Sequence, residues 1–219
     1  MKKILILALS LGALTSYAQK GKWVKLFDGK TTTGWHNWNA TGVKGWHVMN
    51  GTLMTHGKSG DLISDKEYEN FELEFEYKVA PKGNSGIIYK VIERPDLSSS
   101  YVSGPEYQII DDVAYPAKLK DTQKTAANYD MQPANDFTVV KPAGEWNTGK
   151  IIVKDNHVEH WLNGKKLVEY EYASTDWIAM VAKSKFADWE YAKPHAKGKI
   201  ALQDHGDMIS FKSIRIREL

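Results

Sequence analysis

Alternation of apolar and polar residues is the clearest pattern in this chain. It is strictest in the run FELEFEYKV, residues 71–79, where every second residue is apolar and those between are Glu or Lys. Successive side chains of a β-strand point to opposite faces, so a period of two predicts a strand with one buried and one solvated face. The glutamates of this run are therefore interpreted as a solvated surface rather than a catalytic cluster.

Several further runs predict strands. SGIIYKVI, residues 85–92, follows the turn APKGN and is expected to pair antiparallel with 71–79, and PEYQIID, residues 105–111, comes next. The run at 150–172 contains two turn signals, Asp155-Asn156 and Asn163-Gly164, whose residues tolerate positive φ, so it predicts three strands. The short runs WVKLFDGK, GWHVMNGTLM and DLIS near the N-terminus predict shorter strands.

The C-terminal part adds two strands and is preceded by one helix. Residues 198–219 predict two strands joined by DHGD, with an irregularity near Lys212 and Ser213, where the parity of the apolar residues changes. STDWIAMVAKSKFADW predicts one short helix near 175–187 with Ser174 or Thr175 as N-cap. Many short strands with regular turns favour an all-β sandwich of two antiparallel sheets.

The first residues differ in character from the rest. Lys2 and Lys3 precede an apolar stretch, and Ser16-Tyr17-Ala18 resembles a cleavage signal. This predicts a signal peptide over residues 1–18, cleaved near Ala18 and too short for a membrane span. Residues 19–219 are then expected to form a single periplasmic or secreted domain.

Composition narrows the chemistry. The chain has no Cys, which excludes disulfides, thiolate metal sites and Cys nucleophiles. Without the two leader lysines, 27 basic residues balance 27 acidic ones, so nucleic acid is not an expected partner. Eight Trp and eleven Tyr suit stacking on sugars, although large aromatics more often fill a β core. Residues 114–142 lack periodicity, which is typical of a functional or mobile loop.

Two short motifs carry candidate functional residues. In GPEYQIIDD, Glu106 and Gln108 share one face of the predicted strand, about 6.5 to 7 Å apart, a spacing suited to one sugar ring. In LQDHGD, Gln203 and His205 repeat the pairing of an amide with a titratable group, and imidazole suits proton transfer near neutrality. Each pair alone is also ordinary on an exposed sheet face; together they favour a concave binding face.

Neighbouring residues extend this face. Asn84 and Lys90 have matching parity on the adjacent predicted strand, where Lys90 could stabilise a negatively charged oxygen. No HExxH or EF-hand motif occurs, so a metal site is expected only if loops bring aspartates such as Asp111 and Asp112 together.

At these residues the chain resembles a known family. LFDGKTTTGW, NSGIIYKV, GPEYQIIDD, VAKSKFADW and GKIALQDHGD, among other motifs in fixed order from Trp23 to Leu219, are similar to the 3-keto-disaccharide hydrolase family. The resemblance implies a concanavalin A-like jelly-roll sandwich and 3-keto-glycoside substrates, oxidised at C3 by a partner sugar 3-oxidoreductase. Relatives tend to carry an aromatic and then Arg after NSGI, where this chain has Ile88-Tyr89-Lys90.

The implied chemistry assigns roles. A ketone at C3 acidifies the proton on C2, so a base can remove it, the glycosidic oxygen can leave by elimination, and water can then add. Glu106 and His205 are the expected acid and base, in either order, and Gln108 and Gln203 would hold hydroxyls. Lys90, or Lys185 of AKSKF, would stabilise the enolate oxygen. No cofactor is certain; a divalent metal held by Asp111 or Asp112 could replace the lysine.

Two alternatives stay open. A non-catalytic, lectin-like carbohydrate-binding module on the same sandwich would need only aromatics and amides. A glycosidase for unoxidised sugars would need a second carboxylate about 5.5 Å or 6.5 to 9.5 Å from Glu106. Asp112 lies six residues further along the chain, roughly 20 Å away on an extended strand, which is too far.

Overall fold

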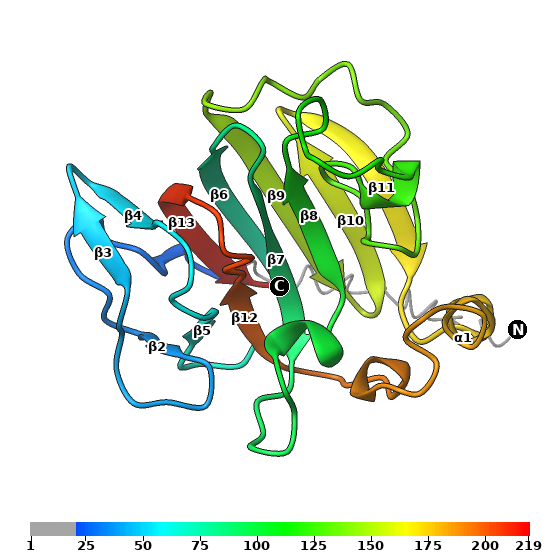
Figure 1. Cartoon of the computed structure of the whole chain (residues 1–219). Coiled ribbons are helices and arrows are strands. Elements are labelled where there is room, and N and C mark those ends of the chain that lie inside the picture. Colours follow the sequence, from blue (N-terminus) through cyan, green and yellow to red (C-terminus); the bar gives the residue numbers. More distant parts are fainter. Residues whose placement is uncertain (1–20) are drawn as a thin grey trace, which may run out of the picture.

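The computed structural model describes residues 21–219, and the predicted leader over 1–18 lies outside them. Thirteen strands in this range form two antiparallel sheets that pack face to face (Figure 1). The strands are β1 (Val24–Lys25), β2 (Trp35–Asn37), β3 (Trp46–Met49), β4 (Thr52–Thr55), β5 (Leu62–Ser64), β6 (Phe71–Val79), β7 (Asn84–Val91), β8 (Glu106–Ile110), β9 (Asn147–Lys154), β10 (His157–Leu162), β11 (Lys165–Glu171), β12 (Lys199–Leu202) and β13 (Ile209–Glu218). One α-helix, α1 (Thr175–Val181), and three short 3-10 helices, η1 (Ser100–Val102), η2 (Asp121–Gln123) and η3 (Glu190–Ala192), complete the elements.

The larger sheet has the order β11-β10-β9-β6-β13-β4-β3, with β1 also paired to β13, and the smaller has the order β2-β5-β12-β7-β8. The predicted two-sheet antiparallel sandwich is thus confirmed. The turns at 155–156 and 163–164 connect β9, β10 and β11 as expected. The irregularity in the last strand is also present, because the register of β13 against β6 shifts between Lys212 and Arg215, and Ser213 has φ +52°.

One predicted pairing is wrong. β6 and β7 do not pair with each other: β6 lies between β9 and β13, whereas β7 lies between β12 and β8 in the other sheet. The short turn between them carries the chain from one sheet to the other. Alternation identified both strands correctly, but it carries no information about which strand lies beside which.

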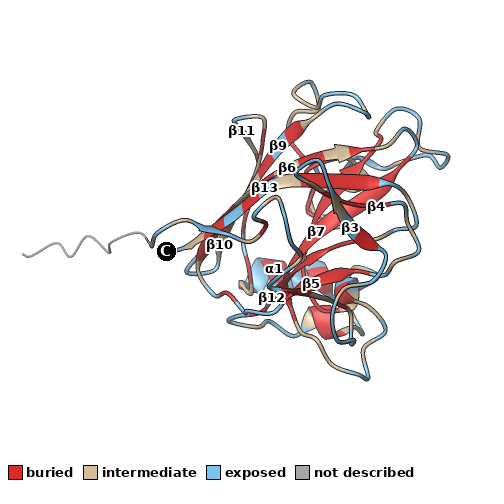
Figure 2. Ribbon diagram, turned by 90° about the vertical axis from the view of Figure 1, so that its left-hand side faces the viewer, coloured by how far each residue is buried: buried red, intermediate tan, exposed pale blue. Residues whose placement is uncertain are grey.

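The hydrophobic core fills the space between the two sheets (Figure 2, buried residues in red). Phe75 of β6 and Tyr107 of β8 meet edge to face there, with ring centroids 5.3 Å apart, and the Tyr107 hydroxyl donates to the carbonyl of Trp161 in β10. Tyr107 therefore points toward the larger sheet. Because side chains alternate along β8, Glu106 and Gln108 point to the outer face of the smaller sheet.

Buried hydrogen bonds of His160 anchor the long loop over residues 114–142. The Nδ1 atom of His160 lies 3.0 Å from the carbonyl of Ala126, and its Nε2 atom lies 2.9 Å from the Tyr89 hydroxyl. The loop also adds backbone hydrogen bonds along β8, including one from the amide of Tyr129 to the carbonyl of Glu106. The long loop is thus held against β8, the strand that carries Glu106.

The helix is shorter than predicted. Ser174 caps it by accepting a hydrogen bond from the amide of Trp177, but α1 ends at Val181 instead of continuing to 187. Ser184 turns the chain there, because its hydroxyl donates to the carbonyl of Val181 and accepts from the amide of Phe186. The segment after the helix is thereby directed toward the smaller sheet.

Candidate active site

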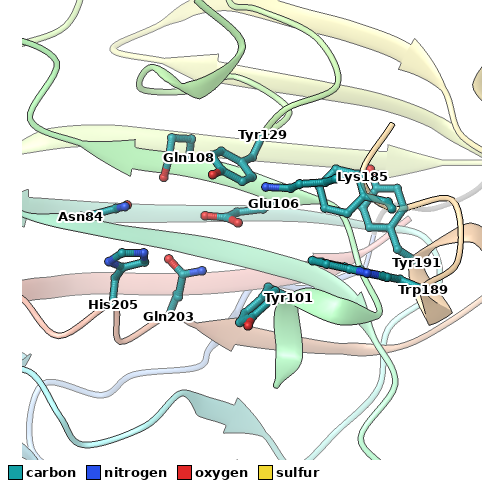
Figure 3. Close-up of a pocket in the computed structure, with 12 residues that line it drawn as sticks. Asn84, Tyr101, Glu106, Gln108, Tyr129, Lys185, Trp189, Tyr191, Gln203 and His205 are labelled. Atoms are coloured by element: carbon teal, nitrogen blue, oxygen red, sulfur yellow. The ribbon is translucent and has the colours of Figure 1, made fainter. Parts of the chain in front are cut away.

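A pocket of about 170 Å³ opens on the outer face of the smaller sheet (Figure 3). Strands β7 and β8 and the end of β12 supply its floor, and three loops supply its rim. Its lining residues are Asn84, Tyr101, Gly104, Glu106, Gln108, Tyr129, Lys185, Phe186, Trp189, Tyr191, Gln203 and His205. Six of the seven residues predicted for catalysis and substrate binding therefore line one pocket; Lys90 does not.

Glu106 is the acidic group at the centre of this pocket. Its side chain lies between Gln203 and Lys185 (Figure 3), and the residue is only 7% exposed. Burial and the neighbouring carboxyl of Asp61 raise the pKa of Glu106, whereas the charge of Lys185 and a hydrogen bond with Gln203 lower it. The resulting pKa is about 8, so the Glu106 carboxyl is mostly protonated at neutral pH.

Gly86 makes room for this carboxyl group. It lies on β7 diagonally opposite Glu106, and a Cβ atom at Gly86 would stand 2.9 Å from the Cγ atom of Glu106. Any other residue would push the Glu106 side chain off the floor of the pocket. Gly86 is thus a positioning residue, and sequence reasoning missed it because the requirement comes from a side chain on the neighbouring strand.

Lys185 is a cation held in place by its neighbours. Its Nζ atom lies 2.7 Å from the Oδ2 atom of Asp130 and 4.2 Å from the centre of the Tyr129 ring. Burial disfavours its charge, but the hydrogen bonds and charges of Asp130 and Tyr129 prevail and raise the pKa of Lys185. The pocket therefore contains a positive charge close to the Glu106 carboxyl.

Three carboxamides complete the polar floor. Gln203 Oε1 and Asn84 Oδ1 are buried and lack hydrogen-bond partners among residues 21–219. Gln108 uses its Oε1 atom to accept from the amide of Ile109, which leaves its NH₂ group available. A buried acceptor without a donor is costly, so these groups fit a ligand that supplies hydroxyl donors.

His205 stands at the rim. It follows β12, is exposed, and has no hydrogen-bond partner within the described part of the chain. Its imidazole is therefore free to contact a ligand in the pocket. In Figure 3 it lies beside Asn84 and Gln203, on the side of the pocket opposite Lys185.

The aromatic rim was not predicted residue by residue. Tyr129 comes from the long loop, and Phe186, Trp189 and Tyr191 come from the segment after α1. Phe186 and Tyr191 stack with centroids 4.4 Å apart, which makes this wall rigid. The available signals were the high Trp and Tyr content and the aperiodic stretch 114–142, neither of which identifies single residues.

Lys90 does not share the face of Asn84, so that placement is wrong. Its φ is +55° and the register of β12 against the end of β7 is irregular, which reverses the parity at that end of the strand. The side chain is buried elsewhere: Nζ donates to the carbonyl of Ala196 at 2.5 Å and lies 5.3 Å from the centre of the Tyr172 ring. Lys185 is the lysine in the pocket.

Asp111 and Asp112 also lie outside the pocket. The Asp111 carboxylate accepts from the amides of Lys82, Val113 and Ala114, which closes the turn after β8. Asp112 accepts from the amide of Thr125 through Oδ1. These interactions anchor loop backbone and do not converge with Glu106.

Within residues 21–219, one group of side chains has the spacing of metal ligands: His157, Glu159 and Glu169 on β10 and β11. Lys166 already forms ion pairs with both glutamates, so a cation would compete with an existing positive charge. The group lies on the larger sheet, away from the pocket. No helix within the same range is long and apolar enough to cross a membrane.

The fold and the pocket define a β-sandwich with a buried acid inside an aromatic-walled polar site, a class that contains sugar-binding and sugar-cleaving proteins. A 3-keto-alpha-glucoside-1,2-lyase-like domain matches residues 22–217. The chain belongs to that family, as its motifs predicted.

Individual proteins are similar to this chain in sequence and in fold. A Bacteroides thetaiotaomicron protein named 3-keto-disaccharide hydrolase is 36% identical over 228 residues, covering 90% of this chain and 78% of that protein. A Parabacteroides distasonis structure described as a proposed glycosyl hydrolase is 39% identical with a TM-score of 0.86, over 91% of this chain and 94% of its own. The Bacillus subtilis carbohydrate-binding module CBM66 is 10% identical with a TM-score of 0.50, over 83% of this chain and 94% of its own, a likeness of fold alone.

Proposed function

We propose that this protein is a hydrolase that cleaves 3-keto-glycosides, including 3-keto-disaccharides, by elimination followed by hydration. Family membership and the relative named 3-keto-disaccharide hydrolase support a hydrolase acting on sugars. The observation that carries the mechanism is the Glu106 carboxyl, buried at the centre of the pocket with a pKa of about 8. A group whose pKa lies near the operating pH is suited to proton transfer.

In the first step, a base removes the proton from C2 and the glycosidic oxygen leaves from C1. We assign the base to His205, which has a free imidazole at the rim, and the acid to Glu106, which is mostly protonated at neutral pH. The C2 proton goes to His205, the electron pair forms the C1–C2 double bond, and the leaving oxygen takes the Glu106 proton. Lys185 stabilises the negative charge that develops on the C3 oxygen.

In the second step, water adds to the resulting enone. The Glu106 carboxylate takes a proton from the water as the water oxygen attacks C1. Protonated His205 then returns a proton to C2. Both groups thus regain their starting states, and the sum of the steps is hydrolysis. Asn84, Gln108 and Gln203 hold the ring hydroxyls during both steps.

The two alternatives account for less of the site. A lectin-like module gains nothing from a buried acid, since burying Glu106 is costly without a role for it. A glycosidase for plain sugars needs a second available carboxylate, and the acids near Glu106 are Asp61 and Asp130. Asp130 is paired with Lys185 at 2.7 Å. Both Asp61 oxygens are occupied, one by the amide of Asp204 at 2.9 Å and the other by the Ser100 hydroxyl at 2.5 Å.

A leaving group that needs no proton separates the two orders of acid and base. With Glu106 as the acid, wild-type kcat/KM for an alkyl 3-keto-glucoside should fall about tenfold per pH unit above pH 8, and Glu106→Gln should regain most of the lost rate of aglycone release when the aglycone is 4-nitrophenol. With Glu106 as the base, Glu106→Gln should release neither aglycone, which would reverse our assignment. The proposed function itself is tested with plain and 3-oxidised glucosides, each with and without a chelator. Cleavage of only the plain sugar would contradict the proposed function.

Two variants test the residues themselves. Glu106→Gln and His205→Ala are each expected to lower kcat by about 100-fold or more, because each removes one proton-transfer group. Full activity of both variants would refute the assignment.

Substrate supply and location are parts of the same proposal. In this proposal a sugar 3-oxidoreductase generates the 3-keto group, because the elimination step requires a sugar that is already oxidised at C3. The predicted leader implies that this occurs outside the cytoplasm, with residues 19–219 as the mature domain. Intact-mass measurement of the protein from periplasm and medium tests cleavage near Ala18.

A further inference from the structure

A second cavity, of about 210 Å³, adjoins the pocket. Tyr101, Gln203 and His205 line both cavities. The remaining lining residues of the second cavity are Trp38, Gly60, Asp61, Ser98, Ser99 and Asp204. A ligand in the first pocket can therefore extend past Gln203 and His205 into the second.

The walls of the second cavity are connected to one another. Asp61 accepts from the amide of Asp204 at 2.9 Å and from the hydroxyl of Ser100, which starts η1. Asp204 in turn accepts from the amides of Ser59 and Gly60. These bonds join three separate loops, so the cavity is preformed and its two carboxylates are occupied by protein donors.

Trp38 presents a fixed aromatic surface to this cavity. Its indole nitrogen donates to the carbonyl of Leu97 at 3.3 Å, and the side chain packs against a small buried cluster. That cluster consists of Ile63, Ile88, Val91 and Ala201. Trp38 itself is only partly buried, so some of its surface is available to a ligand.

The polar groups around Trp38 are suited to an uncharged ligand. Ser98 and Ser99 have hydroxyl groups without side-chain partners within residues 21–219. The lining contains two carboxyl groups and, among the described residues, no Lys or Arg. An anionic ligand would meet like charge there, whereas a neutral sugar would meet a ring and two hydroxyls.

We propose that the cavity lined by Trp38, Ser98 and Ser99 binds the leaving group of the substrate and accepts an uncharged sugar ring stacked on Trp38. This inference rests on the proposed function, because the shared boundary residues Gln203 and His205 place the cleaved bond between the two cavities. The oxidised ring occupies the first pocket, where Lys185 lies. Glu106 is hydrogen-bonded to Gln203 at the boundary, beside the glycosidic oxygen.

The test compares two substrates that share the oxidised ring. One is a neutral 3-keto-disaccharide and the other is the methyl 3-keto-glucoside, which has no second ring. Trp38→Ala should lower the ratio of kcat/KM for the disaccharide to that for the methyl glycoside about 10-fold, mainly through KM, as expected for lost stacking. An unchanged ratio would overturn the proposal.

Two further variants guard against a general structural effect. Ser98→Phe, at an exposed position, fills the cavity without removing core contacts and should lower the same ratio. Trp23→Ala removes another partly buried Trp, one that contacts Arg215 and Arg217 on the larger sheet, and should leave the ratio at the wild-type value. An equal loss with Trp23→Ala would overturn the assignment to Trp38.

Binding measurements separate this inference from the proposed function. If the wild-type protein cleaves neither 3-keto substrate, the proposed function fails, and calorimetry with a plain neutral disaccharide and methyl glucoside then tests the cavity. Weaker disaccharide binding in Trp38→Ala, relative to methyl glucoside, would support the subsite. Equal affinities in the variant and wild type, or no binding to either, would overturn it.

Discussion

At the scale of single residues, the pocket depends on a position without a side chain. Gly86 leaves the space that the Glu106 carboxyl occupies, and that carboxyl has the raised pKa on which the proposed mechanism rests. The backbone at Gly86 has an ordinary strand conformation, so alanine is conformationally allowed there. The requirement for glycine therefore comes from the neighbouring strand.

Gly86→Ala should lower kcat about 100-fold by displacing Glu106 by about an ångström, with a smaller effect on KM. Gly149→Ala is the matched control, because its Cβ would crowd Phe75 in the core instead of the pocket. The control should lower the melting temperature but retain kcat in the folded protein. If Gly86→Ala retained kcat as Gly149→Ala does, Gly86 would not position Glu106.

Four of the six predicted residues that line the pocket were predictable because the signals for them are local. Glu106 and Gln108, and likewise Gln203 and His205, are two residues apart, and alternation places such pairs on one face. The same reasoning gave the wrong face for Lys90. Its positive φ reverses the alternation of side chains along the strand, and the sequence does not show this change. The aromatic wall was missed because loop residues have no period from which to read a direction.

At the scale of elements, α1 connects the larger sheet to the wall of the pocket. The helix follows β11, and the chain after it supplies Lys185 and the stacked aromatics. Trp177 of the helix stacks on Tyr191 of the wall at 5.7 Å and contacts Tyr172 at 4.8 Å. The order of this wall therefore depends on a helix of only seven residues.

Ser174→Ala should lower the free energy of unfolding by about 1 kcal/mol, because it removes the side-chain cap on the amide of Trp177. Ser174→Asn is the matched control, since asparagine caps helices as well as serine does. Urea denaturation of the three proteins measures the difference. A Ser174→Asn variant as unstable as the alanine variant would contradict the role of the cap.

Strands and turns were predictable from sequence, whereas their partners were not. Alternation and turn residues identified 71–79, the three strands of 150–172 and even the irregularity at Ser213. The false pairing of 71–79 with 85–92 arose because a short turn usually joins neighbours in one sheet. In this sandwich it joins the two sheets instead.

At the scale of the whole molecule, the buried acid links stability to pH. The pKa of Glu106 is raised from 4.5 to about 8, so between these values the folded state binds more protons than the unfolded state. The contribution of Glu106 is therefore most favourable below pH 4.5, decreases as pH rises, and levels off above about pH 8. Between the two extremes of pH, the contribution of Glu106 to the free energy of unfolding changes by about 3 to 5 kcal/mol.

Glu106→Gln should remove this decrease, because an amide does not ionise. Relative to wild type, the variant should gain about 3 to 5 kcal/mol in free energy of unfolding between pH 5 and pH 9, measured by denaturation at both. Glu145→Gln, at an exposed position, should reproduce the wild-type dependence. A Glu106→Gln curve parallel to wild type would mean that Glu106 is not protonated in the folded protein.

The place of β13 has a consequence for how the protein is made. This last strand lies in the middle of the larger sheet, between β6 and β4, and also holds β1. Until it arrives, β4 and β3 on one side have no strand connecting them to β6, β9, β10 and β11 on the other. A chain emerging from the ribosome therefore cannot close this sheet before Ile209–Glu218 have been synthesised, and folding of the larger sheet must await this ten-residue strand.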